Sequence, residues 1–312
     1  MKQKHKKYTS FSRQKKFPVR ILIVIFILLL LVSSIVFGIR YYKKYYASLP
    51  SIRSVYKDWN ENNYQAVYDK TEILLKRRPL DGEVLALHGF ASYYIFSEQT
   101  DLSISYTYLS TAVTFLRQAL YFAAQNEIPK ISYVLGKAYY QQGYYYADLA
   151  VKYLDNAYNA GFQAEDLSEF RGMAAAMLGD IHKAIDSFTQ TLVSNPSDLV
   201  LYALAENYAK ISDSEKAKLY FYDTIDKTKD ILLELKCRNK LVSIYLEEKN
   251  FSEAEKEIHT VLEKDINSAE AHYNLGVIYE VKGDIVKARS EWRKALRLNP
   301  LDEQTRTKLN LK

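Results

Sequence analysis

The sequence predicts an all-α protein: a single N-terminal transmembrane helix, a right-handed α-solenoid of about seven helix pairs, and a short C-terminal capping helix. Two series of small residues predict the solenoid. The first recurs at steps of 34, 33, 37 and 34 residues: Ala150, Ala184, Ala217, Ala254 and Ala288. The second lies 12 to 14 residues earlier in each unit: Gly136, Gly172, Ala205, Val242 and Gly276. A period near 34 residues fits a helix-turn-helix unit, so each series marks one helix of a hairpin.

The composition agrees with long packed helices. The chain is 48% hydrophobic and contains only 10 Gly and 6 Pro, which excludes a disordered chain. The formal net charge is +6, but eight Lys or Arg and no acidic residue lie in residues 1–20. Residues 21–312 therefore contain 35 basic and 37 acidic residues, a balance of −2. Because the repeats are not basic, no nucleic acid partner is expected.

Residues 21–39 (ILIVIFILLLLVSSIVFGI) predict a retained transmembrane helix. As a helix, these nineteen uncharged residues span about 28 Å, which matches a hydrocarbon core of roughly 30 Å. The alternative is a cleaved signal peptide, whose apolar region is shorter, about 7 to 15 residues, and is followed by a small-residue cleavage site. Here Arg40, Lys43 and Lys44 follow instead, and no cysteine is present for lipoprotein processing.

The charges that flank this segment predict its orientation. The eight basic residues of segment 1–20 exceed the three after the span, so the tail is expected in the cytoplasm and the repeats outside it. This predicts a single-pass protein of the cell (inner) membrane with a periplasmic repeat domain if the source is bacterial. The reverse orientation, with cytosolic partners, is the alternative. Attraction of the tail to anionic lipid, about 1 kcal/mol per basic residue, is generic.

The remaining boundaries follow from proline and from the period. Residues 40–50 form a juxtamembrane segment that ends at Pro50, because proline disfavours helix in the preceding residue. Residues 51–300 hold the repeats. Segment 51–79 is the weakest unit because it lacks both small markers, and a longer loop near Ser97 is expected to split the next one. Residues 301–312 predict a polar cap over the exposed end of the array.

The last unit, residues 269–300, is the clearest. Gly283-Asp284 marks the turn between its helices and Asn299-Pro300 ends the second helix. The unit resembles the tetratricopeptide repeat (TPR) family in the type and spacing of Leu275, Gly276, Tyr279, Gly283, Ala288, Trp292, Ala295 and Pro300. It departs from the family at His272, where a large aromatic residue is usual.

The resemblance implies a concave groove lined by the first helix of each pair. In that register the positions three before, one after and four after each small marker share a face. These positions supply the predicted protein- or peptide-binding residues Phe90, Tyr93, Tyr133, Lys137, Tyr140, Glu169, Met173, Tyr202, Glu206, Asn239, Ser243, Tyr273, Val277 and Glu280. Some family members bind a C-terminal carboxylate through a lysine and an asparagine in consecutive turns. The corresponding pairs here, Tyr133 with Lys137 and Glu169 with Met173, do not match that pattern.

The predicted function is a non-catalytic membrane-anchored scaffold that binds peptide or protein segments in this groove. The resemblance implies a context of envelope assembly or handling of exported proteins. One alternative is a structural spacer or oligomerisation module that acts through the convex face. Another is an envelope serine hydrolase, because Ser54 and Lys57 have the serine-lysine spacing of penicillin-recognising enzymes, but the companion motifs are missing. Five scattered histidines show no ligand spacing, so no metal or cofactor is expected.

Overall fold

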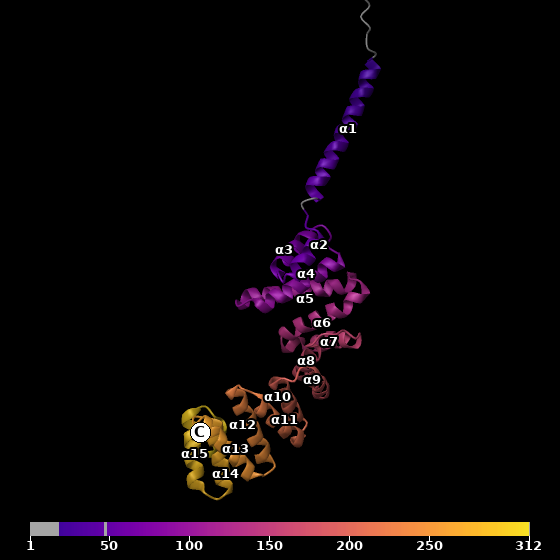
Figure 1. Cartoon of the computed structure of the whole chain (residues 1–312). Coiled ribbons are helices and arrows are strands. Elements are labelled where there is room, and N and C mark those ends of the chain that lie inside the picture. The colour runs from indigo at the N-terminus through magenta and orange to yellow at the C-terminus, as the bar shows by residue number, and fades with distance from the viewer. Residues whose placement is uncertain (1–18, 47–48, 312) are drawn as a thin grey trace, which may run out of the picture. The chain divides into compact units, whose positions relative to one another are not determined.

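The computed structural model describes residues 19–46 and 49–311. Within these residues the chain is helical and contains no strand, in agreement with the predicted fold class. The chain folds as two compact units, one ending at Arg78 and the other beginning at Pro79. Figure 1 shows the order of the helices along the chain.

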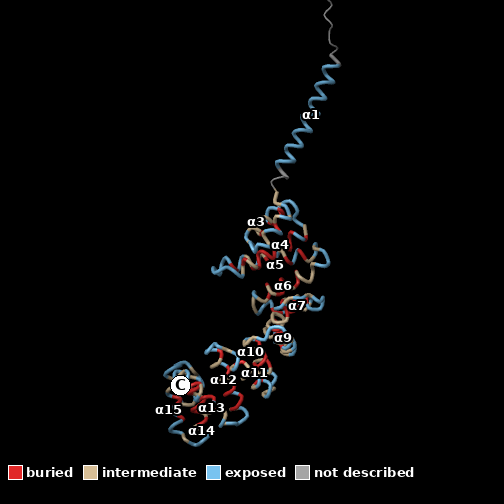
Figure 2. Tube along the Cα trace, in the orientation of Figure 1, coloured by how far each residue is buried: buried red, intermediate tan, exposed pale blue. Residues whose placement is uncertain are grey.

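The first unit contains one long apolar helix and one helix pair: α1 (Val19–Tyr46), α2 (Ile52–Asn60) and α3 (Tyr64–Leu75). Helix α1 includes the predicted segment 21–39 and continues beyond it. Its residues 21–44 are exposed throughout, as Figure 2 shows. The stretch Ile21–Lys44 is long and apolar enough to cross a membrane, a property that a signal sequence near an N-terminus shares.

Helices α2 and α3 form a regular pair in segment 51–79. Val55 and Val67 are fully buried, and the Lys70 ammonium forms an ion pair with the Asp58 carboxylate. Asn62 has a left-handed backbone with φ 56, and the Asn63 side chain then caps α3 by accepting from the Ala66 N–H. Four turns of the second unit have the same geometry, so the pair with the weakest repeat signal in the sequence is built like those four.

The second unit contains six further pairs and one short terminal helix. The pairs are α4 (Gly82–Glu98) with α5 (Leu102–Phe122), α6 (Ile128–Gln141) with α7 (Ala147–Asn159), α8 (Leu167–Leu178) with α9 (Ile181–Ser194), α10 (Asp198–Lys210) with α11 (Ser214–Lys227), α12 (Ile231–Glu247) with α13 (Phe251–Lys264), and α14 (Ala269–Val281) with α15 (Ile285–Leu298). Helix α16 (Glu303–Lys308) follows, and 3-10 turns occupy Gln125–Glu127 and Tyr144–Tyr146. Within this unit, each second helix packs on its partner and on the next first helix, except α15, which packs on α14 and α16. Together with α2 and α3, the described residues contain seven pairs, in line with the prediction.

The two series of small residues lie where helices cross. All five alanines of the first series are 0% exposed. A Cβ atom on Gly136 would lie 2.6 Å from Leu154 Cγ, and one on Gly172 would lie 2.8 Å from the Phe188 ring. The absence of a side chain at these positions therefore allows the second helix to approach the first at this distance.

The turns within four of these pairs share one geometry. Gly179, Ser212, Lys249 and Gly283 have positive φ angles of 87°, 60°, 59° and 79°. Each is followed by an Asp or Asn whose side chain caps the second helix, accepting the N–H of the third residue along, as at Asp180 and Asp284. Glycine occupies this left-handed conformation without steric cost, whereas Ser212 and Lys249 do not.

The first pair of the second unit differs from the expectation of a longer loop near Ser97. Helices α4 and α5 are 17 and 21 residues long, and only residues 99–101 separate them. Asp101 explains the early start of α5, because its side chain accepts from the N–H groups of Ser103 and Ile104. The additional residues therefore extend the helices instead of the loop.

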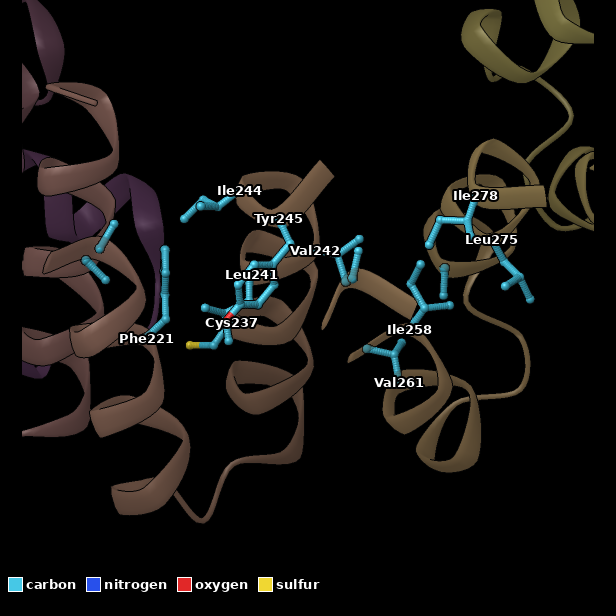
Figure 3. Packing of buried hydrophobic residues seen from close by; sticks show 14 of the residues in the cluster. Phe221, Cys237, Leu241, Val242, Ile244, Tyr245, Ile258, Val261, Leu275 and Ile278 are labelled. Carbon is cyan, nitrogen blue, oxygen red and sulfur yellow. The ribbon is translucent and has the colours of Figure 1, made fainter. Parts of the chain in front are cut away.

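The core of the later pairs is continuous across α10 to α14. Phe221, Cys237, Leu241 and Ile258 are fully buried between successive helices, as Figure 3 shows. His272 is 5% exposed and differs from the aromatic residue usual in the TPR family. Its Nδ1 lies 2.6 Å from a Glu291 carboxylate oxygen and its Nε2 lies 3.0 Å from the Ile266 carbonyl oxygen, so both ring nitrogens have partners.

Candidate protein-binding surface

The predicted groove residues lie on the first helices of the six pairs in the second unit. They differ in accessibility. Phe90 and Tyr93 on α4 are only 2% and 6% exposed, so they support the surface from below. The others are half-buried, except for Ser243, which is exposed: Tyr133, Lys137 and Tyr140 on α6, Glu169 and Met173 on α8, Tyr202 and Glu206 on α10, Asn239 and Ser243 on α12, and Tyr273, Val277 and Glu280 on α14.

The α6 residues form the centre of what we call the Lys137 cluster: Tyr93, Tyr133, Lys137, Asp166 and Phe170. The Lys137 ammonium lies 2.7 Å from an Asp166 carboxylate oxygen and donates to the Tyr133 hydroxyl at 3.1 Å. The Tyr133 hydroxyl in turn donates to the other Asp166 oxygen. One lysine, one tyrosine and one aspartate thus form a closed triangle of polar contacts.

Aromatic rings surround the same ammonium group. Lys137 Nζ lies 4.4 Å from the centre of the Phe170 ring, 5.0 Å from that of Tyr133 and 5.7 Å from that of Tyr93. A cation at these distances from aromatic faces is attracted by their negative quadrupoles. Because Tyr93, Lys137 and Phe170 belong to α4, α6 and α8, one side chain links three successive first helices.

Burial changes the protonation behaviour of this cluster. Burial, then the hydrogen bond to Asp166, raises the pKa of Tyr133 well above its ordinary value of 10.0, and burial likewise raises the pKa of Tyr93. Burial, with the nearby Asp166 charge, raises the pKa of the Glu169 carboxyl above 4.5, although Lys137 opposes this effect. The tyrosines therefore remain neutral donors at physiological pH.

A mixed aromatic and thioether surface lies beside the cluster. We call it the Tyr140 patch: Tyr140, Phe170 and Met173. The Tyr140 hydroxyl lies 3.6 Å from the Met173 sulfur, and the Tyr140 and Phe170 rings meet edge to face with centres 5.7 Å apart. All three side chains are half-buried, so part of each faces solvent. Such a surface accepts apolar and aromatic groups because Met and Tyr combine large contact area with adaptable or polar atoms.

Charges dominate the middle of the surface. Glu206 forms a salt bridge of 3.0 Å with Lys240 on α12, and Lys236 Nζ lies 4.7 Å from the centre of the Tyr202 ring. Burial, reinforced by the Glu206 carboxylate, raises the pKa of Tyr202. These contacts connect α10 with α12, and the charge of Glu206 is balanced by Lys240 of the next helix pair.

The C-terminal end of the surface is partly covered by the chain itself. The Asn239 amide donates to Glu270 at 3.0 Å, and the Lys308 ammonium of α16 forms an ion pair with Glu280. Tyr273 lines a pocket of about 300 Å³ together with residues of α15 and α16 and with Asn299 and Asp302 between these helices. The segment predicted as a cap therefore contacts one predicted groove residue directly.

The sequence prediction missed two contributors to this surface. Asp166 was not predicted because it lies just before α8, outside the positions counted from the small markers. Phe170 lies two residues before Gly172, also outside those positions. The only sequence signal for Asp166 is its position directly before the helix that begins at Leu167, because acidic residues are common at helix starts.

The serine-lysine pair of the hydrolase alternative is not assembled as a catalytic pair. The Ser54 hydroxyl donates to the Ser51 carbonyl oxygen at 2.8 Å, within the first turn of α2. The Lys57 ammonium lies 3.8 Å from Glu61, and its side chain is 73% exposed. A lysine base would need to accept the serine proton, and here the two groups have separate partners.

Comparison with known proteins supports the repeat architecture. Residues 269–302 match the family model of the tetratricopeptide repeat. The C-terminal part of a TPR repeat-containing protein from Cytophaga hutchinsonii has a similar structure with TM-score 0.60 and 15% identity, covering 83% of this chain and 99% of that one. YrrB, a TPR protein with an unusual peptide-binding site, gives a TM-score of 0.51 with 19% identity, covering 63% of this chain and 98% of that one.

A chain of the Naa15/Naa10 complex bound to HypK-THB is also similar, with TM-score 0.53 and 15% identity, covering 83% of this chain and 39% of that one. No curated protein matches the chain. These likenesses show a shared fold at low identity. The chain therefore has the architecture of a TPR solenoid.

Proposed function

We propose that this TPR-like solenoid is a membrane-anchored scaffold that binds peptide or protein segments along its first helices. The observation that supports this most directly is the Tyr140 patch, which is half-exposed beside the Lys137 cluster. Because Lys137 already pairs with Asp166, it does not act as a free cation for a ligand carboxylate. The patch therefore favours apolar or aromatic side chains of an incoming segment.

Preorganisation adds to this proposal. Lys137 contacts groups on α4, α6 and α8, so the helices beneath the patch are held before a ligand arrives. A receptor that is already ordered avoids the entropy cost of ordering it on binding. Selectivity then depends on the side chains of the Tyr140 patch and on charged neighbours such as Glu169.

Crosslinking in membranes tests the groove. Photoreactive residues are introduced at Tyr140 and Met173, with Thr189 as the matched control because it is exposed on the second helix α9. The expected result is an adduct with the same partner from both groove positions and none from Thr189. Equal adducts from all three positions, or adducts from Thr189 alone, would contradict groove binding and favour the structural spacer that acts through its second helices.

Alanine substitution separates these two functions further. The spacer alternative predicts that a partner still copurifies after Tyr133, Tyr140 and Tyr202 are replaced by alanine. The groove proposal predicts that copurification is lost. Circular dichroism of the triple variant must show retained helicity, because Tyr133 also supports the Lys137 cluster.

We also propose that α1 anchors the chain with segment 1–20 in the cytoplasm and the repeats in the periplasm. The eight basic residues before the span support this orientation, and generic attraction to anionic lipid follows from them. Envelope assembly or handling of exported proteins is the proposed context.

A cysteine introduced at Asn310 tests the orientation of the chain. Cys237, the only native cysteine, is buried, so the introduced cysteine is the one that a thiol reagent labels. If the repeats lie in the periplasm, a thiol reagent is expected to label this cysteine in cells whose outer membrane alone has been made permeable. Labelling only after the reagent also enters the cytoplasm would overturn the orientation.

A further inference from the structure

A second surface with different chemistry lies on α15 and the residues after α16. It is a hollow of about 560 Å³ lined by Arg289, Arg293, Arg297, Leu296, Leu309 and Leu311. We call it the arginine hollow. Its volume lies within the range of about 300 to 1,000 Å³ that is usual for binding pockets. It belongs to a second helix, whereas all predicted groove residues belong to first helices.

The three arginines have no partner within the described part of the chain. All three are exposed, and no described carboxylate lies within ion-pair distance of any of them. Two basic residues on other second helices are paired, since Lys183 lies 2.7 Å from Asp155 and Lys218 lies 3.0 Å from Glu248. The arginine hollow therefore differs from those paired positions in gathering three arginines without an ion-pair partner on one face of α15.

The four-residue spacing of the arginines destabilises α15 and also sets the distances between their guanidinium groups. Residues 289, 293 and 297 follow one another at four-residue steps on one helix, where like charges repel and destabilise it by about 0.2 to 0.5 kcal/mol per pair. Four residues of helix rise about 6 Å, so the guanidinium groups form a row with roughly that spacing. Each guanidinium can hold a carboxylate through two parallel N–H···O bonds.

The apolar wall of the hollow adds a second requirement for a ligand. Leu296 and Leu309 are half-buried, and Leu311 is 49% exposed, so leucine side chains from two segments face the same space as the arginines. A free inorganic anion would satisfy the arginines but leave these leucines in water. A ligand that fits both has carboxylates along one side and an apolar side chain among them.

We propose that the arginine hollow binds an acidic segment of a partner protein, with carboxylates about 6 Å apart and an apolar anchor. Glutamates at every fourth position of a helix meet this spacing, and a leucine between them reaches Leu296 and Leu309. This binding does not depend on the Tyr140 patch. The same scaffold then has two surfaces, one for apolar segments and one for acidic segments.

The test uses the full-length chain in phosphatidylcholine nanodiscs and a fluorescein-labelled helical peptide with three glutamates four residues apart and two leucines between them. Fluorescence anisotropy is expected to show saturable binding. A peptide with glutamine in place of glutamate, and one with serine in place of leucine, are expected to bind at least tenfold more weakly. Equal binding of the glutamine peptide would overturn the proposal.

Variants of the chain assign the site. The triple change Arg289→Gln, Arg293→Gln and Arg297→Gln is expected to weaken peptide binding roughly 100-fold, since hydrogen bonds between charged groups are strong. The matched control changes three exposed lysines on or near α10 and α11 to glutamine: Lys210, Lys227 and Lys229. It is expected to change the affinity less than threefold. Equal loss in both triple variants would overturn the assignment to the arginine hollow.

Two further measurements keep folding and membrane binding apart from this result. The arginine variant should unfold at the same urea concentration as the parent or a higher one, because like-charge repulsion has been removed. Vesicles of phosphatidylcholine with phosphatidylserine are the competing ligand, tested by flotation of detergent-solubilised chain. If the arginine variant loses vesicle binding and keeps peptide binding, the hollow binds anionic membrane and the proposal is wrong.

Discussion

A Cβ atom on Gly276 would lie 2.4 Å from the indole Nε1 of Trp292, and that same Nε1 donates to the Tyr273 carbonyl oxygen at 3.2 Å. The glycine on α14 therefore makes room for the largest side chain on α15. Gly276→Ala improves helix propensity by about 1 kcal/mol. We nevertheless expect a net destabilisation of about 1 to 3 kcal/mol, because overpacking displaces a fully buried tryptophan. Urea unfolding followed by circular dichroism measures it.

A neighbouring pair shows how this clash can be relieved. At the corresponding position α10 has Ala205, and the residue opposite on α11 is Phe221. Adding Trp292→Phe to Gly276→Ala reproduces that combination. The double variant is expected to be more stable than the sum of the two single changes predicts. Strict additivity would show that the two side chains do not compete for space.

The left-handed turns predict a stabilising substitution. Lys249 has φ 59, a conformation that strains residues with a Cβ atom. Lys249→Gly removes this strain, and we expect a gain of about 0.5 kcal/mol after the greater entropy of glycine in the unfolded chain. The control is Lys256→Gly in the middle of α13, which is expected to cost about 1 kcal/mol. A loss of stability at both positions would contradict the steric account of the turn.

The ion pairs around Glu234 predict a pH dependence of stability. Burial raises the pKa of Glu234, but hydrogen bonds from Lys264 and Arg238, each at 2.8 Å, outweigh burial and lower it below 4.5. A carboxyl whose pKa is lower in the folded state stabilises the fold above its unfolded pKa. This stabilisation is lost as the pH falls through the folded pKa.

Glu234→Gln is therefore expected to reduce the free energy of unfolding by about 1 to 2 kcal/mol at pH 7 and by progressively less as the pH falls below 4.5 toward the folded pKa. Urea unfolding between pH 7 and pH 3 measures the difference. Glu263→Gln is the control, because Glu263 is exposed on the neighbouring helix α13. A difference that stays constant with pH would show that the carboxylate charge of Glu234 is not responsible.

The Lys137 cluster predicts energetic coupling between two neighbouring helix pairs. Lys137→Met keeps the apolar stem and removes the charge, and leaves Asp166 without its cation. We expect a loss of about 1 to 2 kcal/mol, less than for a fully buried pair because Asp166 is 36% exposed. Asp166→Asn in the same background should cost much less than it costs alone. A double-mutant cycle measures this coupling, and a coupling energy near zero would refute the pairing.

The two series of small residues predict the helix pairs because few residue types fit where two helices of a pair pack closely. Gly136 and Gly276 show this restriction in the sequence. The left-handed turns are harder to predict from the sequence. Glycine indicates such a turn, but at two of the turns Ser212 and Lys249 adopt the strained φ angle instead. The surface is harder still. Counting along α4 predicts Phe90 and Tyr93 in the groove, but both are buried, and Lys130 and Lys137 of the next helix pair lie over their rings.

The two tryptophans lie in the terminal pairs of the array, and this has a spectroscopic consequence. Trp292 is 2% exposed in the last pair with Lys308 above its ring, whereas Trp59 is half-buried beside Tyr64 in the first. Since the chain contains no other tryptophan, Trp59→Phe leaves Trp292 as a single emitter. Its emission maximum should then report opening of the C-terminal end alone, with a native fluorophore.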